Sequence, residues 1–213
     1  MIIYILIILK SYLFIERLQK KGEKMKKIFL WVLTILSLCT LTSCDRGKRV
    51  VEDFPTAVSS LESYKITGKL TSYFPSRTKE SLITVYYKNP DLYRVEVDNM
   101  DLGDKQIVLK NTSGVHILIP SLNKTFKVKS SWPLNSSYPY LFQSLCKDML
   151  NDEEKVTTHD EESSTVEMKV KVFDDSMPYK QKIIFNNKTG YPNTVLVYDE
   201  KENLITKFTF DKI

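Results

Sequence analysis

Histidine and cysteine are scarce in this sequence, which holds two histidines and three cysteines among 213 residues. A metal site needs several such ligands at short spacing, and neither His116 nor His159 has a partner in a CxxC or HxxxH pattern. The acidic runs at 152–154 and 161–162 lack the alternating Asp, Asn and Gly residues of a calcium loop. We therefore expect no metal and no cofactor.

An excess of basic charge is also missing from most of the chain. Residues 1–43 hold seven of the 31 Lys and Arg residues and two of the 26 Asp and Glu residues, which leaves 24 of each kind from residue 44 onward. A protein that follows nucleic-acid phosphates needs an uncompensated basic stripe, usually with interleaved aromatic residues. The sequence therefore predicts no nucleic-acid partner.

The apolar run Ile28–Leu38 is shorter than the roughly 20 residues that a membrane-spanning helix needs. It follows a basic start at 25–27, which is the order of an export signal, and it precedes Leu41, Thr42, Ser43 and Cys44. These four residues resemble the bacterial lipobox. That resemblance implies cleavage before Cys44, a diacylglycerol on its thiol and an acyl group such as palmitate on its new amine. Two or three acyl chains hold a protein durably at a membrane, so we expect a lipid-anchored protein on the extracytoplasmic face of the cell membrane.

A second apolar stretch lies in residues 1–24, where Lys10 interrupts it. Two export signals in series are not expected in one protein. Lys20–Lys24 can be encoded by purine-rich DNA that contains AGGAG, the appearance of a ribosome-binding site. We therefore expect translation to start at Met25, residues 1–24 to be a mis-assigned extension, and residues 25–43 to be the signal peptide.

Cys146 is the single cysteine beyond the leader and the lipobox, so no intramolecular disulfide can form once Cys44 is acylated. A cysteine nucleophile needs a neighbouring base, and nothing in the sequence couples His116 or His159 to this thiol. Cys146 also lies in a segment whose apolar residues have helical spacing, which favours a buried thiol. The sequence therefore predicts no catalytic residue and no enzyme.

The mature chain is expected to consist of a polar tether at 44–49 and one domain at 50–213. Apolar residues recur every three to four positions in 50–61, which predicts an amphipathic helix that Pro55 bends or restarts. The same spacing predicts a second helix at 140–150.

Elsewhere the apolar pattern has a period of two, which is typical of strands, and turn residues separate the segments. Hairpin turns are expected at 186–190 and 199–203. The expected strands are 64–70, 81–88, 92–98, 106–110, 115–119, 125–129, 165–173, 180–186, 193–199 and 204–211. About ten strands with two helices predict a mainly β (α+β) fold, in which helices cover the concave face of a strongly curved antiparallel sheet or open half-barrel.

Three stretches carry a resemblance to a known family: Ser63–Gly68, Val85–Val95 and Asn187–Pro192. These stretches resemble the LolA-like and RseB-like lipoprotein-associated domains in two features. One is a Pro turn between an aromatic strand and an Arg-bearing strand, and the other is a late Thr-Gly-x-Pro hairpin. The resemblance covers about residues 50–213. Within that family the lipobox and the neutral mature domain look most like the clostridial germination lipoprotein GerS. The resemblance implies a LolA-like fold and a non-catalytic lipoprotein that supports spore germination by binding and activating an N-acetylmuramoyl-L-alanine amidase, which modifies cortex peptidoglycan.

Two functions remain open at this point. A protein-binding accessory lipoprotein would anchor its partner, a cell-wall amidase, on exposed aromatic residues such as Tyr73, Phe74, Tyr138 and Tyr140, unless these pack in the core. A carrier of lipids or lipoproteins would instead hold acyl chains in its concave face. The sequence leaves open whether the chain forms a homo-oligomer and whether it also lies in the spore envelope.

The interior distinguishes these functions, because a carrier needs a cavity and an accessory protein can fill that space with its own side chains. The bulky residues available to fill it include Phe126, Trp132, Phe142, Phe173 and Phe185. We therefore favour the accessory protein.

Overall fold

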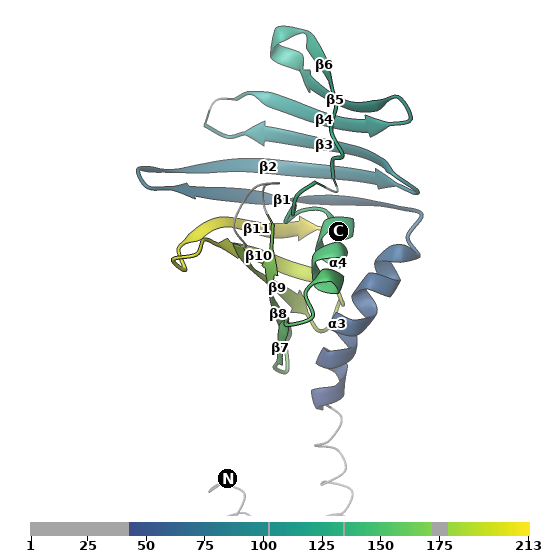
Figure 1. Cartoon of the computed structure of the whole chain (residues 1–213), viewed down its shortest axis with the longest axis vertical. Coiled ribbons are helices and arrows are strands. Elements are labelled where there is room, and N and C mark those ends of the chain that lie inside the picture. The colour runs from purple at the N-terminus through teal and green to yellow at the C-terminus, as the bar shows by residue number, and fades with distance from the viewer. Residues whose placement is uncertain (1–42, 102, 134, 172–178) are drawn as a thin grey trace, which may run out of the picture. The chain divides into compact units, whose positions relative to one another are not determined.

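One antiparallel sheet of eleven strands forms in the part of the chain that the computed structural model describes, residues 43–213 without 102, 134 and 172–178 (Figure 1). The chain divides into two units after residue 45, and this sheet lies in the second unit, Arg46–Ile213. The helices are α3 (Ser43–Ser59) and α4 (Phe142–Asn151), with a short 3-10 helix η1 (Pro120–Leu122). The strands are β1 (Ser63–Phe74), β2 (Arg77–Lys88), β3 (Leu92–Asn99), β4 (Lys105–Asn111), β5 (Gly114–Ile119), β6 (Lys124–Val128), β7 (Val156–His159), β8 (Ser163–Val170), β9 (Tyr179–Asn186), β10 (Pro192–Tyr198) and β11 (Leu204–Lys212).

The strand order is β6-β5-β4-β3-β2-β1-β11-β10-β9-β8-β7, so β1 and β11 join two meanders at the centre of the sheet. β6 and β7 form its two edges and are not paired with each other, so the sheet stays open. Figure 1 shows α3 and α4 on one side of the sheet, beside the strands from β1 through β11 to β7. The expected fold class, a mainly β curved and open antiparallel sheet with two helices on one face, is confirmed.

The side chains of the strands alternate between a buried inner face and an exposed outer face, as the two-residue period requires. In β2, for example, Ile83, Val85 and Tyr87 are buried, and Leu82 and Tyr86 are exposed. Val85 pairs directly with Val95 of β3 and with Ile66 of β1, so the inner residues of neighbouring strands form rows. These rows supply the sheet half of the hydrophobic core.

Aromatic rings connect the two helices to the sheet. Phe54 of α3 lies with its ring centroid 5.3 Å from that of Phe142 in α4 and 5.1 Å from that of Phe185 in β9, and both contacts are edge-on. Phe142 and Phe185 are fully buried, and Phe54 is 2% exposed. Burial of each such ring stabilises the fold by about 2 to 3 kcal/mol, and the edge-on geometry adds roughly 1 kcal/mol per pair.

The ten expected strands are all present, with ends that differ by a few residues, and both expected hairpin turns form. The expected helix at 140–150 is α4. β7 was not expected, because it lies in a polar stretch whose Val156, Thr157 and Thr158 are exposed and show no alternation. It forms because β8 offers it a pairing edge.

The first helix differs from expectation at its start. α3 begins at Ser43 and continues through Pro55 without interruption, so it includes the residues expected as a polar tether. The tether was expected because this segment is polar, but a polar segment can still form a helix. The single Gly47 costs about 1 kcal/mol within a helix, which does not stop it. The domain bounds expected from the sequence stay predictions.

Gly68 lies where the backbone of β1 approaches β11 closely, beside an irregularity in their register between Thr67 and Gly68. A Cβ at this position would lie 2.4 Å from the carbonyl oxygen of Thr209 and 2.5 Å from Cζ of Phe208. Phe208 is fully buried, so its ring has no free space to move into.

We predict that Gly68→Ala lowers the free energy of unfolding by about 3 kcal/mol, because two packed groups must shift to admit one methyl group. The control is Gly103→Ala, where φ is +64° and nothing lies within 4 Å of the added Cβ. That variant should lose only about 1 kcal/mol, through backbone strain alone. Urea unfolding followed by circular dichroism measures both, and equal losses would contradict the close approach of β1 to β11 as the cause.

Candidate functional site

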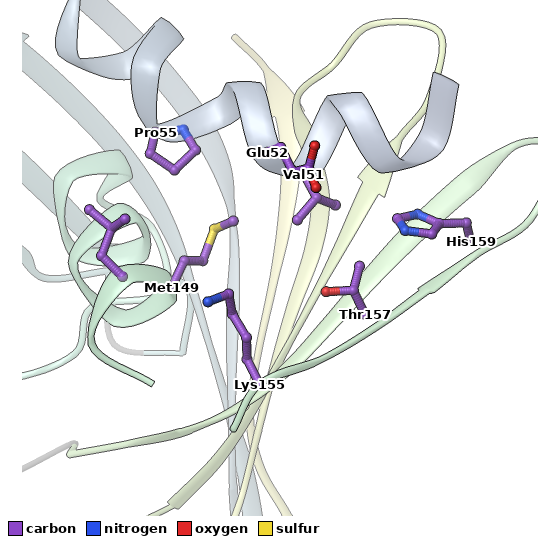
Figure 2. Close-up of a pocket in the computed structure, with 8 residues that line it drawn as sticks. Val51, Glu52, Pro55, Met149, Lys155, Thr157 and His159 are labelled. Carbon is purple, nitrogen blue, oxygen red and sulfur yellow. The ribbon is translucent and has the colours of Figure 1, made fainter. Parts of the chain in front are cut away.

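A pocket of about 390 Å³ opens where α3, α4 and the segment that contains β7 meet (Figure 2). Apolar side chains from both helices form much of its wall, and polar side chains from β7 and its flanks form the rest. Figure 2 shows Lys155, Thr157 and His159 pointing toward Val51 and Met149 across this space. The full lining is Val51, Glu52, Pro55, Met149, Leu150, Lys155, Thr157 and His159.

His159 is held in one orientation by a hydrogen-bond relay behind the pocket. The Ser164 hydroxyl donates to Asn187 Oδ1 at 2.6 Å, and Asn187 Nδ2 donates to the carbonyl oxygen of Asp160 at 2.9 Å. His159 Nδ1 lies 3.0 Å from the same hydroxyl, which must accept because its hydrogen is already used. Nδ1 therefore donates this hydrogen bond, which fixes the orientation of the ring.

The ammonium of Lys155 is held at the pocket by the carbonyl oxygen of Asp152, which it approaches at 3.3 Å. Glu52 supplies a carboxylate from α3 on the opposite wall. Such a site, with apolar side chains and a few ionisable groups at its rim, can accept an apolar group that carries a polar head. Within the described residues, no group of three or more His, Cys, Asp and Glu side chains is placed to hold a metal ion.

The predicted lipidation site lies at the start of the described chain. Ser43 and Cys44 are the first two residues of α3, and Leu41 and Thr42 lie outside the described residues. Acylation of Cys44 therefore stays a prediction. Among the helices of the described part, none is long and apolar enough to cross a membrane.

The aromatic residues singled out in the sequence divide between the core and the surface. Trp132, Phe142 and Phe185 are buried in the core as expected, whereas Phe126 is 47% exposed and Phe173 lies outside the described residues. Tyr73 and Phe74 are exposed at the end of β1, and Tyr138 and Tyr140 pack against the core. The pocket residues Lys155 and Thr157 were not singled out, because β7 gave no strand pattern.

Comparison with known proteins places this fold in a family. A family model described as "Sporulation protein YdcC-like" matches residues 24–212. The chain belongs to this family. It is 35% identical over 191 residues to the sporulation protein YdcC of Bacillus subtilis, a match that covers 88% of this chain. The match covers 56% of the B. subtilis protein, so this chain spans little more than half of that relative's length.

Several solved structures are similar to this member of the YdcC-like family at the level of fold. One is the CwlD amidase of Clostridioides difficile in complex with the GerS lipoprotein, with 15% identity, a TM-score of 0.46 and coverage of 78% of this chain and 94% of that chain. A Vibrio parahaemolyticus domain named as an outer membrane lipoprotein-sorting protein matches with 13% identity, a TM-score of 0.40 and coverage of 79% and 92%. The MucA/MucB complex of Pseudomonas aeruginosa matches with 16% identity, a TM-score of 0.41 and coverage of 79% and 55%.

Cys146 is a buried thiol in this YdcC-like chain, 8% exposed on the inner side of α4. Burial, and to a smaller extent the negative charge of Asp148, raise its pKa to about 12. The thiol is therefore protonated at neutral pH, when it is a poor nucleophile.

Asp148 is a buried carboxylate on α4, with 6% of its surface exposed. Its Oδ2 accepts a hydrogen bond from the Ser137 hydroxyl at 2.6 Å and one from Gln181 Nε2 at 3.3 Å. Burial raises the pKa of Asp148 to about 6, although these hydrogen bonds and the charge of Lys147 act in the opposite direction. The carboxylate ties α4 to the loop before it and to β9.

The raised pKa of Asp148 predicts a pH-dependent stability. Between about pH 4 and pH 6 the folded protein binds a proton that the unfolded chain has released, so stability falls as the pH rises through this window and is level above it. Two pKa units correspond to about 3 kcal/mol. Asp148→Asn keeps the acceptor for Ser137 without the charge, so it should be more stable than the wild type at pH 7.5, by up to that amount, and equal to it at pH 4.

Urea unfolding of both proteins between pH 4 and pH 8 measures this difference. Asp104→Asn, at an exposed position, is the control and should track the wild type throughout. If the difference in the free energy of unfolding between Asp148→Asn and the wild type does not change with pH, the raised pKa of Asp148 is contradicted.

Proposed function

We propose that this chain is a non-catalytic accessory lipoprotein of sporulating cells, anchored through Cys44 at the extracytoplasmic face of the membrane, and that it binds a protein partner. We further propose that this partner is an N-acetylmuramoyl-L-alanine amidase, which the chain activates toward the cortex peptidoglycan that germination requires.

The filled inner face of the sheet is the observation that carries this proposal. Phe54, Phe142, Phe185 and Phe208 are all at least 98% buried, and they occupy the space between the helices and the central strands. A carrier would need that space for an acyl chain. A protein that fills it with its own rings offers its surface, which favours partner binding over transport.

Family membership supports the part of the proposal that concerns sporulation. The chain belongs to the sporulation protein YdcC-like family, over nearly all of the described domain. The amidase as partner follows from the resemblance of the sequence to the germination lipoprotein GerS. The anchor follows from Leu41, Thr42, Ser43 and Cys44, and an anchored protein suits a partner that works at one place in the envelope.

The pocket at α3, α4 and β7 favours a second candidate, a lipid-binding or lipoprotein-binding function. Its volume of about 390 Å³ and its apolar residues Val51, Pro55 and Met149 can accept part of an acyl chain, with Lys155 at the head. This pocket lies at one edge of the domain and leaves the core filled, so the accessory function stays the first proposal.

We predict that the full chain with a C-terminal tag, expressed in its spore-forming host and crosslinked during sporulation, captures an amidase in near-stoichiometric amount. Mass spectrometry of the purified material identifies both proteins and lipids. The control is a fusion of residues 1–49 to an unrelated domain, which keeps the leader and the lipobox and should capture no amidase. Addition of the purified chain should then raise the activity of that amidase. Phospholipid or acylated protein without an amidase would contradict the proposal and favour the second candidate.

A further inference from the structure

The inner face of the sheet is not covered by the helices along its whole width. One cross-strand row runs from Val95 in β3 to Val108 in β4, Ile117 in β5 and Phe126 in β6, each paired directly with the next. Val95 is 1% exposed, Val108 and Ile117 are partly buried, and Phe126 is 47% exposed. Figure 1 shows β5 and β6 extending beyond both helices. An apolar row therefore leaves the core and ends at an open edge of the sheet.

Lysines surround the end of this row. Lys124, Lys127 and Lys129 are all exposed, and none of the ion pairs found among the described residues involves them. Lys124 shares the inner face with Phe126, and Lys127 lies on the outer face opposite His116. Leu122 of η1, which is 59% exposed, immediately precedes β6. We call Leu122, Lys124, Phe126, Lys127 and Lys129 the β6 edge.

A second copy of this chain does not fit the β6 edge, because the lysines of two such edges repel each other. Lysines on an edge strand commonly prevent pairing with other copies. Preventing such pairing does not require an exposed phenylalanine beside the lysines, because an apolar ring favours association. The combination instead selects a partner that is apolar on one face and acidic beside it.

The β6 edge also lies across the sheet from the residues that follow the proposed anchor. Val51 and Glu52, which soon follow Cys44 in sequence, line the pocket with Thr157 of β7. β7 is the opposite edge of the sheet from β6. The β6 edge and the pocket therefore lie at opposite ends of the strand order, and the lysines of the β6 edge do not line the pocket.

We propose that an extended, acidic segment of a partner protein adds to the sheet along the β6 edge. The free backbone groups of β6 pair with that segment, Phe126 packs against an apolar side chain of it, and carboxylates contact Lys124 and Lys127. The proposal deepens the accessory function and rests on it, since it states where the protein partner docks and what chemistry that partner presents.

The test measures binding of a fluorescent peptide that contains Glu-Val-Thr-Glu to the full chain in detergent. In antiparallel pairing this sequence places valine opposite Phe126 and glutamate opposite Lys127 and Lys124. The comparison peptide has glutamine in place of glutamate. We expect the acidic peptide to bind at least ten-fold more tightly than the glutamine peptide, and its affinity to fall steeply with added salt. Lys124→Glu/Lys127→Glu should weaken it at least ten-fold, and Phe126→Ser should weaken it several-fold.

The matched control is Lys188→Glu/Lys201→Glu, which makes the same change of net charge at two exposed hairpin turns and should bind as the wild type does. Thermal unfolding of every variant checks that the fold is kept. Absence of peptide binding, or equal binding by both double variants, would overturn the docking site. Binding of the wild type to anionic phosphatidylglycerol vesicles in place of the peptide, lost in Lys124→Glu/Lys127→Glu, would also overturn it, in favour of a membrane contact.

The same variants separate this proposal from the accessory function. If the wild-type chain captures an amidase in the host and Lys124→Glu/Lys127→Glu captures it equally well, the docking site is wrong and the accessory function stands. If the peptide binds as expected and no amidase is captured, the amidase is wrong and the β6 edge stands.

Discussion

The packing of Phe54 between Phe142 and Phe185 is the contact on which the rest of this domain depends. Three elements far apart in the sequence, α3, α4 and β9, meet at these rings. Among the described residues, these three rings are at least 98% buried and occupy space between the helices and the sheet. The helices are thereby fixed over one part of the inner face, and β5 and β6 extend beyond both helices. Filling of the core and exposure of the β6 edge are thus two results of the same packing.

This arrangement gives the two edges of the sheet different surroundings. At β7, the middle of α3 and the end of α4 lie beside the strand and leave a pocket with His159 and Lys155 at its rim. At β6, no helix among the described elements covers the strand, and lysines flank an exposed ring. The two edges thus present different chemistry, a partly apolar pocket at one and an exposed ring among lysines at the other.

Much of this fold could be predicted from the sequence, because strands such as β2 alternate strictly between apolar and polar residues and α4 has helical spacing. β7 could not be predicted, since Val156 and its two threonines are exposed and pair only because β8 lies beside them. The exposure of Phe126 was also not predictable. Its strand pattern places it on the inner face, but the reach of the helices over that face depends on contacts between α3, α4 and β9. The pocket joins Val51 to Thr157, and no local pattern connects such distant residues.

The central claim, that the domain fills its own interior, can be tested directly by native mass spectrometry of the protein purified from its host. A filled interior predicts the mass of the covalent polypeptide alone, with no non-covalently bound lipid. A stoichiometric, non-covalent lipid that survives gentle desolvation, together with loss of that lipid on Phe54→Trp, would contradict it and show that the space under the helices holds a ligand.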